Sequence, residues 1–245
     1  MKSTILKFAF FGVAAAGFIL ASCTKGADSR LTTQTDLTNK TQIRVVVATV
    51  NASRNYVYVD GSPLNGASLT SGSVFPSSGV YAASIDPGVK NFLVRDTLTA
   101  ATQIPLSFAE NMQPAHNYTV FLYDTINAPK QRTVETKYEI PADHSCRLRF
   151  ANFIYNASAV PNIDVFSVIK NANVFTNVPV TGVTDFIPYP INTAPDTLYI
   201  RETGTLTNVV SVPVGSTTFN DKRSYTLLYR GSYKGTKATT LYTDR

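Results

Sequence analysis

The clearest guide to the fold is the run Tyr118-Thr119-Val120-Phe121-Leu122-Tyr123, which has a counterpart in Tyr225-Thr226-Leu227-Leu228-Tyr229-Arg230. Both runs are apolar at consecutive positions instead of alternating between apolar and polar side chains. They are rich in β-branched and aromatic residues, which suit a pleated and half-buried surface. Because a strand that is apolar on both faces must be covered on both, we expect each run to be a central strand of its sheet.

Three further pairs of segments match in the same order along the chain. They are Ile43–Val47 with Cys146–Phe150, Asn51–Ser53 with Asn156–Ser158, and Phe92–Asp96 with Leu198–Glu202. The members of all four pairs are 103 to 107 residues apart. A period of that length is a common domain size, so we expect two copies of one module, at 43–140 and 146–245, with a join at 141–145.

Short strand signals separated by turn residues run through both modules. Tyr56–Val59 leads into the turn dipeptide Asp60-Gly61, and Asp86-Pro87-Gly88 precedes the strand-like Val89–Val94. No apolar stripe with a helical period follows Ser22. The sequence therefore predicts an all-β chain of two tandem immunoglobulin-like β-sandwich modules. The chain has no Trp, so the Cys…Trp…Cys core of antibody domains is missing and only the architecture is expected.

The first 22 residues differ from the rest and are predicted to be a signal peptide. Lys2 and Lys7 precede Phe8–Ala21, an uncharged apolar run that is too short to span a bilayer comfortably. The run ends in Leu20-Ala21-Ser22-Cys23, which resembles the lipobox of bacterial lipoproteins. The resemblance implies cleavage after Ser22, a diacylglyceryl group on the thiol of Cys23 and often an acyl chain on its amine. The alternatives are an ordinary secretory signal and an uncleaved anchor.

Residues 23–42 are predicted to be the lipidated cysteine and a flexible tether. Between Thr24 and Gln42 only Leu31 and Leu37 are large and apolar, which is too little to bury. Two or three lipid chains give stable membrane anchoring. The expected location is therefore the cell envelope, on the outer membrane of a diderm bacterium, facing the periplasm or the surface.

The second module resembles an uncharacterised extracytoplasmic domain that usually occurs in tandem in bacterial lipoproteins. The resemblance lies in Arg149–Asn152, in Asn156–Phe166 and in the last strands, which carry a Tyr-Thr-Val-Phe-like run. The first module matches that run fully, but it has Tyr56 where the second has Asp164 and lacks the insertion around Pro161. That domain family has no known function, so the resemblance implies no catalytic residue.

Signals for catalysis or metal binding are sparse. His116 and His144 are the only histidines, and no metalloprotease, nucleophile-elbow or phosphate-loop motif occurs. We therefore predict no catalytic residue, no metal and no cofactor. After lipidation of Cys23 only Cys146 remains, and we expect a small, partly buried side chain there; a reactive thiol, activated by His144, is the alternative.

Charge is sparse and mildly basic, with 22 Lys+Arg against 16 Asp+Glu. Five basic residues gather late in the chain, at Lys222, Arg223, Arg230, Lys234 and Lys237. They are expected to form a solvated strand edge that discourages edge-to-edge pairing, or else a surface that attracts phosphates or acidic glycans. Nucleic acid is excluded as a partner by the expected location and by the lack of a recognition motif.

Three tripeptides are similar to the Asp-Ser/Thr-aliphatic acceptor of extracytoplasmic O-glycosylation in some diderm bacteria. They are centred on Thr97, Thr125 and Thr197. The alternative is that the Asp of each tripeptide accepts a turn hydrogen bond at a strand end.

Taken together, these features predict a lipid-anchored envelope protein that acts without catalysis in binding, adhesion or assembly. The expected partners are the membrane, through the lipid on Cys23, and glycans or envelope proteins. The alternative is an enzyme, or an enzyme accessory, that acts on envelope or imported polysaccharide. A cleft with clustered acidic or His side chains would favour the enzyme, and an aromatic surface would favour binding.

Overall fold

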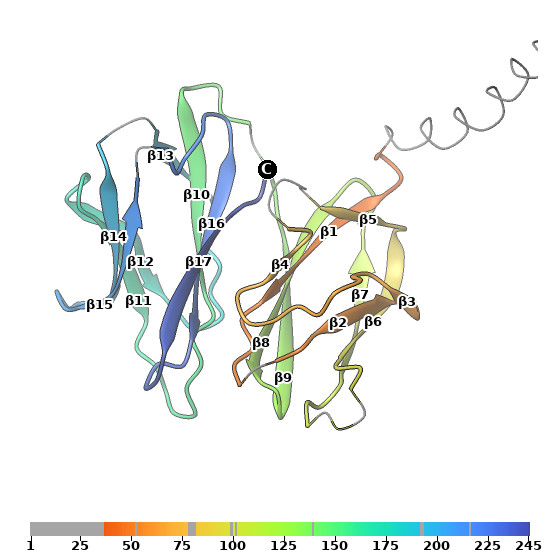
Figure 1. Ribbon diagram of the computed structural model, residues 1–245. Helices are drawn as coiled ribbons and strands as arrows, with labels where there is room; N and C mark the ends of the chain where they lie inside the picture. The colour runs from red at the N-terminus through yellow and green to blue at the C-terminus, as the bar shows by residue number, and fades with distance from the viewer. Residues whose placement is uncertain are drawn as a thin grey trace, which may run out of the picture. The chain divides into compact units, whose positions relative to one another are not determined.

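The computed structural model describes residues 37–245 apart from 52, 78–81, 99, 101, 139, 192–193 and 216. The predicted signal peptide, Cys23 and most of the predicted tether lie outside these residues. The described part is all-β, with seventeen strands and no helix, as the sequence predicts (Figure 1). Within it, no helix is long and apolar enough to cross a membrane. Residues 39–245 form one compact unit.

The strands fall into two groups along the chain. The first group is β1 (Thr41–Val47), β2 (Tyr56–Val59), β3 (Ser62–Pro63), β4 (Val74–Phe75), β5 (Ala83–Ile85), β6 (Gly88–Arg95), β7 (Leu106–Met112), β8 (Asn117–Thr125) and β9 (Ala128–Glu135). The second group is β10 (Ser145–Asn152), β11 (Ile163–Ser167), β12 (Ala172–Val178), β13 (Ile187–Pro190), β14 (Asp196–Glu202), β15 (Asn208–Val214), β16 (Ser224–Gly231) and β17 (Lys237–Thr243).

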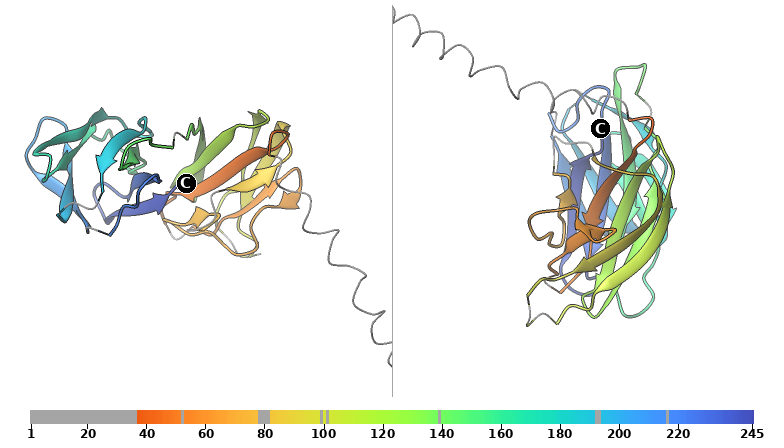
Figure 2. Two further views of the ribbon diagram at one scale, coloured as in Figure 1. Left: turned by 90° about the horizontal axis from the view of Figure 1, so that it is seen from above. Right: turned by 90° about the vertical axis from the view of Figure 1, so that its right-hand side faces the viewer.

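Each group forms a two-layered β-sandwich (Figure 2). In the first module, the sheet β4-β1-β8-β9, with β5 also paired to β1, packs on the sheet β3-β2-β6-β7. In the second module, the sheet β13-β10-β16-β17 packs on the sheet β12-β11-β14-β15. We call the sheets that contain β1 and β10 the facing sheets, and the other two the outer sheets. The immunoglobulin-like topology remains a prediction.

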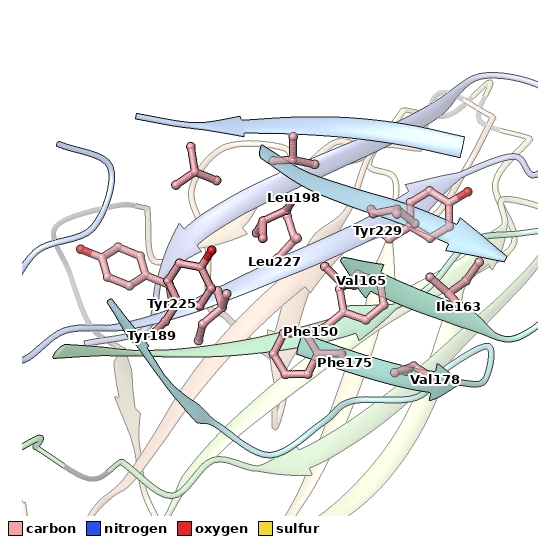
Figure 3. Packing of buried hydrophobic residues seen from close by; sticks show 14 of the residues in the cluster. Phe150, Ile163, Val165, Phe175, Val178, Tyr189, Leu198, Tyr225, Leu227 and Tyr229 are labelled. Atoms are coloured by element: carbon pink, nitrogen blue, oxygen red, sulfur yellow. The ribbon is translucent and has the colours of Figure 1, made fainter. Parts of the chain in front are cut away.

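Each sandwich has an apolar core of its own, made by side chains that alternate inward from its two sheets. In the first module Val45 and Val120 of the facing sheet are buried with Phe92 of the outer sheet. In the second, Phe150 and Leu227 are buried against Leu198 (Figure 3). The cores explain why apolar residues recur at every second position in these strands, because one face of each sheet is covered by the other sheet.

The predicted central strands are confirmed. β8 lies between β1 and β9, and β16 lies between β10 and β17. Consecutive residues, and so both faces, are buried at Thr119–Leu122 of β8 and at Ser224–Tyr229 of β16. The sequence did not indicate that β1 pairs with β8, and β10 with β16, in parallel.

Strand register corrects one of the segment pairings predicted from the sequence. Ile43 lies opposite Tyr118, and Leu148 opposite Tyr225, so Ile43 corresponds to Leu148 and not to Cys146. The first segment pair then has the same spacing as Asn51 and Asn156, without an insertion between them. The error arose because a shift of two residues in a strand preserves which face every side chain occupies.

One turn and two boundaries complete the comparison with the sequence. The predicted turn at Asp60-Gly61 joins β2 to β3, with both residues at positive φ. β1 begins at Thr41 and β10 at Ser145, so the ends of the predicted tether and join already belong to strands.

Candidate binding cleft between the modules

The two facing sheets contact each other through equivalent residues of the repeat. A buried cluster contains Val46, Ala48 and Phe121 from the first module and Ala151, Phe153, Leu228 and Tyr242 from the second. Register equates Val46 with Ala151 and Phe121 with Leu228, because each pair occupies matching ladder positions. Two copies of one surface therefore meet, as in a two-fold symmetric dimer.

A buried polar network lies beside this cluster and joins the same sheets. Arg149 of β10 pairs with Asp244 at 3.0 Å, and both side chains are almost fully buried. The guanidinium also donates to Thr226 at 2.7 Å and to Thr136 of the first module at 3.2 Å. Burial alone would lower the pKa of Arg149, but the charge of Asp244 offsets this and holds the pKa above its usual value.

The first module contributes a second arginine at the equivalent place. Arg44 of β1 corresponds to Arg149, is buried, and donates to the backbone carbonyl of Asp244 at 3.2 Å. Asp244 thus binds arginines of both modules. The carboxylate itself pairs with Arg149 of its own module, and a buried charge is costly without such a partner. The hydrogen bonds that join the two sheets are those from Arg44 to the Asp244 backbone carbonyl and from Arg149 to Thr136.

Equivalent turns of the two modules also meet arginines from the opposite module. In the first module Gly72 has φ 89°, and the Arg230 guanidinium lies where a Cβ of residue 72 would be, at 2.3 Å. In the second module Thr181 occupies the same turn position with φ 63°, and its carbonyl accepts a hydrogen bond from Arg132. The turn is thus the same, but the arginine that reaches it comes from β16 in one case and from β9 in the other.

One cleft of about 520 Å³ lies between the modules beside Thr181, and we call it the Tyr155 cleft. It is lined by Tyr123, Asp124, Lys130, Phe153, Ile154, Tyr155, Asn156, Ser158, Ala159, Val160, Pro179, Val180 and Thr181. The rings of Tyr123 and Phe153 lie 5.4 Å apart and tilted. Lys130 and Asp124 form an ion pair at 2.7 Å. The buried amide nitrogen of Asn156 has no hydrogen-bond partner among the described residues.

A second cleft of about 460 Å³ lies further along β9 and is more charged. Its charged lining residues are Glu135, Lys137, Arg147, Arg149 and Asp185, with Phe186 as its aromatic side chain. The Arg149 guanidinium lies 4.7 Å from the centre of the Phe186 ring. Arg149 is already bound by Asp244 and is therefore not free to bind a ligand in this cleft.

The histidines and the remaining thiol lie apart from both clefts. His116 faces Glu135 at 3.2 Å, and His144 faces Asp221 at 3.1 Å. The Cys146 side chain is fully buried in the second core, more deeply than expected, and burial raises its pKa to about 12. A thiol so protonated is a poor nucleophile, which disfavours the reactive alternative. Among the described residues, no group of three or more His, Cys, Asp and Glu could hold a metal ion.

The basic residues near the C-terminal end do not form one surface. Lys222 and Arg223 precede β16, Lys234 and Lys237 follow it, and Arg230 packs on Gly72. The Gly231–Thr236 segment connects β16 to β17. The basic residues expected to form an anion-binding surface are therefore divided between the two ends of a strand.

The three threonines of the acceptor-like tripeptides lie in different environments. Thr97 is exposed after β6, and Asp96 accepts a hydrogen bond from the Leu98 backbone at 3.0 Å, as the turn alternative expects. Thr125 is half-buried at the end of β8. Thr197 is half-buried within β14, and the neighbouring Asp196 accepts a hydrogen bond from Ser167 at 2.6 Å inside the second module. Exposure therefore favours Thr97 alone as an acceptor.

Sequence reasoning missed the Tyr155 cleft, because its members come from four segments and meet only when the modules pack. The available signal was that Tyr123 and Tyr155 lie at or just beyond strand ends, where side chains reach the rim of a sandwich.

No family model matches the chain, and no curated protein matches it.

Proposed function

We propose that the protein is a lipid-anchored component of the cell envelope that acts by binding, without catalysis, and that the Tyr155 cleft is its binding site. The observation that carries the proposal is the composition of that cleft, in which Tyr123, Phe153 and Tyr155 accompany Asp124, Lys130 and Asn156. Binding sites commonly combine aromatic walls with a few polar groups that fix the orientation of a ligand.

The surrounding contacts favour a preformed site. Phe153 is anchored by stacking on Phe121, with ring centroids 4.5 Å apart. The backbone of Tyr155 donates to the carbonyl of Gly231 at 2.8 Å and accepts from Tyr233 at 2.8 Å. A site held in place before binding loses less conformational entropy when the ligand arrives.

The binding role is tested with the detergent-solubilised full chain immobilised on a resin and exposed to the envelope fraction of its host. We expect a glycan or protein component to be retained by the native chain and lost with Tyr155→Ala. Identical retention by the two proteins would contradict a role for the cleft. New reducing ends in the envelope polysaccharide after incubation with the native chain would favour the enzyme alternative.

The anchor is tested separately by growth with a labelled fatty acid. The native chain should carry the label after cleavage, while Cys23→Ser should remain an unlabelled precursor, because the thiol is the proposed acceptor. A variant that is still cleaved after residue 22 and still acylated would refute the lipobox interpretation.

A further inference from the structure

We propose that the Tyr155 cleft binds an uncharged carbohydrate chain. The inference rests on the proposed function, since it names the ligand class of the same site. A comparison within the molecule supports it. Equivalent backbone positions of the two modules occur at two places between them, and the side chains at the two places differ.

The counterpart of the Tyr155 cleft contains an arginine side chain instead of an aromatic wall. Register equates Tyr123 with Arg230, because Tyr123 follows Leu122 in β8 as Arg230 follows Tyr229 in β16. The Arg230 guanidinium lies against Gly72 and donates to Ser71 at 3.3 Å. In that copy the Arg230 side chain extends from the second module onto the turn of the first.

Two more differences introduce aromatic rings on the cleft side. The backbone hydrogen bonds of Ala48 and Phe153 are equivalent, and so are those of Val50 and Tyr155. In the counterpart, therefore, Ala48 occupies the position of Phe153, and Val50 occupies the position of Tyr155. Phe153 is buried in the cluster between the facing sheets, so packing accounts for its ring. Tyr155 is half-buried, and the counterpart packs without a ring at its position, so packing alone does not account for Tyr155.

The polar lining fits a neutral ligand with many hydroxyl groups. Asp124 and Lys130 are the charged residues of the lining, and their charges offset each other at 2.7 Å. The Arg132 guanidinium lies beside the cleft but is bound to the Thr181 carbonyl. The carboxylate accepts hydrogen bonds, the ammonium donates them, and Asn156 and Ser158 do both. A sugar hydroxyl can both donate and accept a hydrogen bond. The apolar face of a sugar ring can pack on an aromatic ring, and tyrosine combines such a ring with a polar hydroxyl.

The test is calorimetric titration of the detergent-solubilised full chain with a panel of hexasaccharides. The uncharged members are cello-, xylo-, manno-, malto- and chitohexaose, and the anionic members are hyaluronan and polygalacturonate hexasaccharides. We expect at least one uncharged member to bind and the anionic members to bind more weakly. Tyr155→Ala should weaken that binding roughly tenfold, the effect of losing one well-placed aromatic contact.

Tyr56→Ala is the matched control, because Tyr56 is a half-buried tyrosine of β2 in the outer sheet of the first module. It should bind like the native chain, and thermal unfolding should show that both variants remain folded. The proposal is overturned if no uncharged member binds, if an anionic member binds best, or if Tyr155→Ala binds as tightly as Tyr56→Ala. If the panel fails while the envelope component is still lost with Tyr155→Ala, only the ligand class is wrong; if both fail, the proposed function fails too.

Discussion

The turn around Gly72 and the turn around Thr181 are the same structure in two settings. Each connects to a facing sheet through matching backbone hydrogen bonds, and each receives an arginine from the opposite module. Around Gly72 the arginine lies where a side chain would be, whereas around Thr181 a side chain is present and a cleft opens beside it. The comparison teaches that a repeated surface can serve packing in one copy and leave a site free in the other.

The largest effect is expected from Asp244→Ala, which removes the carboxylate that pairs with the buried Arg149 guanidinium. Arg149 would remain buried without its partner, and breaking a buried pair in this way costs about 3–5 kcal/mol. Urea unfolding of the full chain measures the loss. Asp86→Ala, which breaks an exposed pair with Lys40, should cost much less, because exposed ion pairs contribute little to stability; equal losses in the two variants would show that the buried pair contributes no more to stability than an exposed one.

A smaller loss is expected when the first turn is given the residue of the second. Gly72→Thr places a β-branched side chain at φ 89° and its Cβ within 2.3 Å of the Arg230 guanidinium. The backbone strain and the displaced arginine together should lower the free energy of unfolding by about 2 kcal/mol. Thermal or urea unfolding measures it, and an unchanged stability would mean that the turn is not constrained as the structure indicates.

The reciprocal exchange should have the smallest effect and the opposite sign. Thr181→Gly relieves a β-branched residue at positive φ, so the free energy of unfolding should rise by about 0.5–1 kcal/mol, because the entropy cost of glycine offsets part of the gain. The hydrogen bond from Arg132 reaches the backbone carbonyl and is retained. A loss of stability would show that the threonine side chain itself supports the turn.

Much of the fold could be predicted, because it depends on local patterns. The two runs that are apolar at consecutive positions predicted the central strands β8 and β16, and Asp60-Gly61 predicted the turn between β2 and β3. The parallel pairing of β1 with β8 could not be predicted, since an apolar strand reads the same in either direction. Nor could the interface: Arg44 and Arg149 look like ordinary polar positions of half-exposed strands. They become buried only when Asp244 lies beside them, and Asp244 is 200 positions from Arg44 and 95 positions from Arg149 in the sequence.

The candidate site could not be predicted from the sequence either, because its residues also meet only when the modules pack. The aromatic and polar lining of the Tyr155 cleft includes Tyr123 from one module and Tyr155 from the other, so no window of sequence contains it. Only the packing of the two facing sheets indicates which aromatic side chains share a cleft.

The central claim is that two repeats, each with a core of its own, are joined by equivalent faces into one cooperative unit. Cys146 tests it directly, because its thiol is buried in the second core with a pKa of about 12 and should react with a thiol reagent at pH 8 only after that core opens. The measurement is the labelling rate of Cys146 in the full chain carrying Val120→Ala, a substitution confined to the core of the first module, with Leu227→Ala in the second core as the reference. Cooperative modules predict that both substitutions accelerate labelling; acceleration by Leu227→Ala alone would contradict the account and show that the modules open independently.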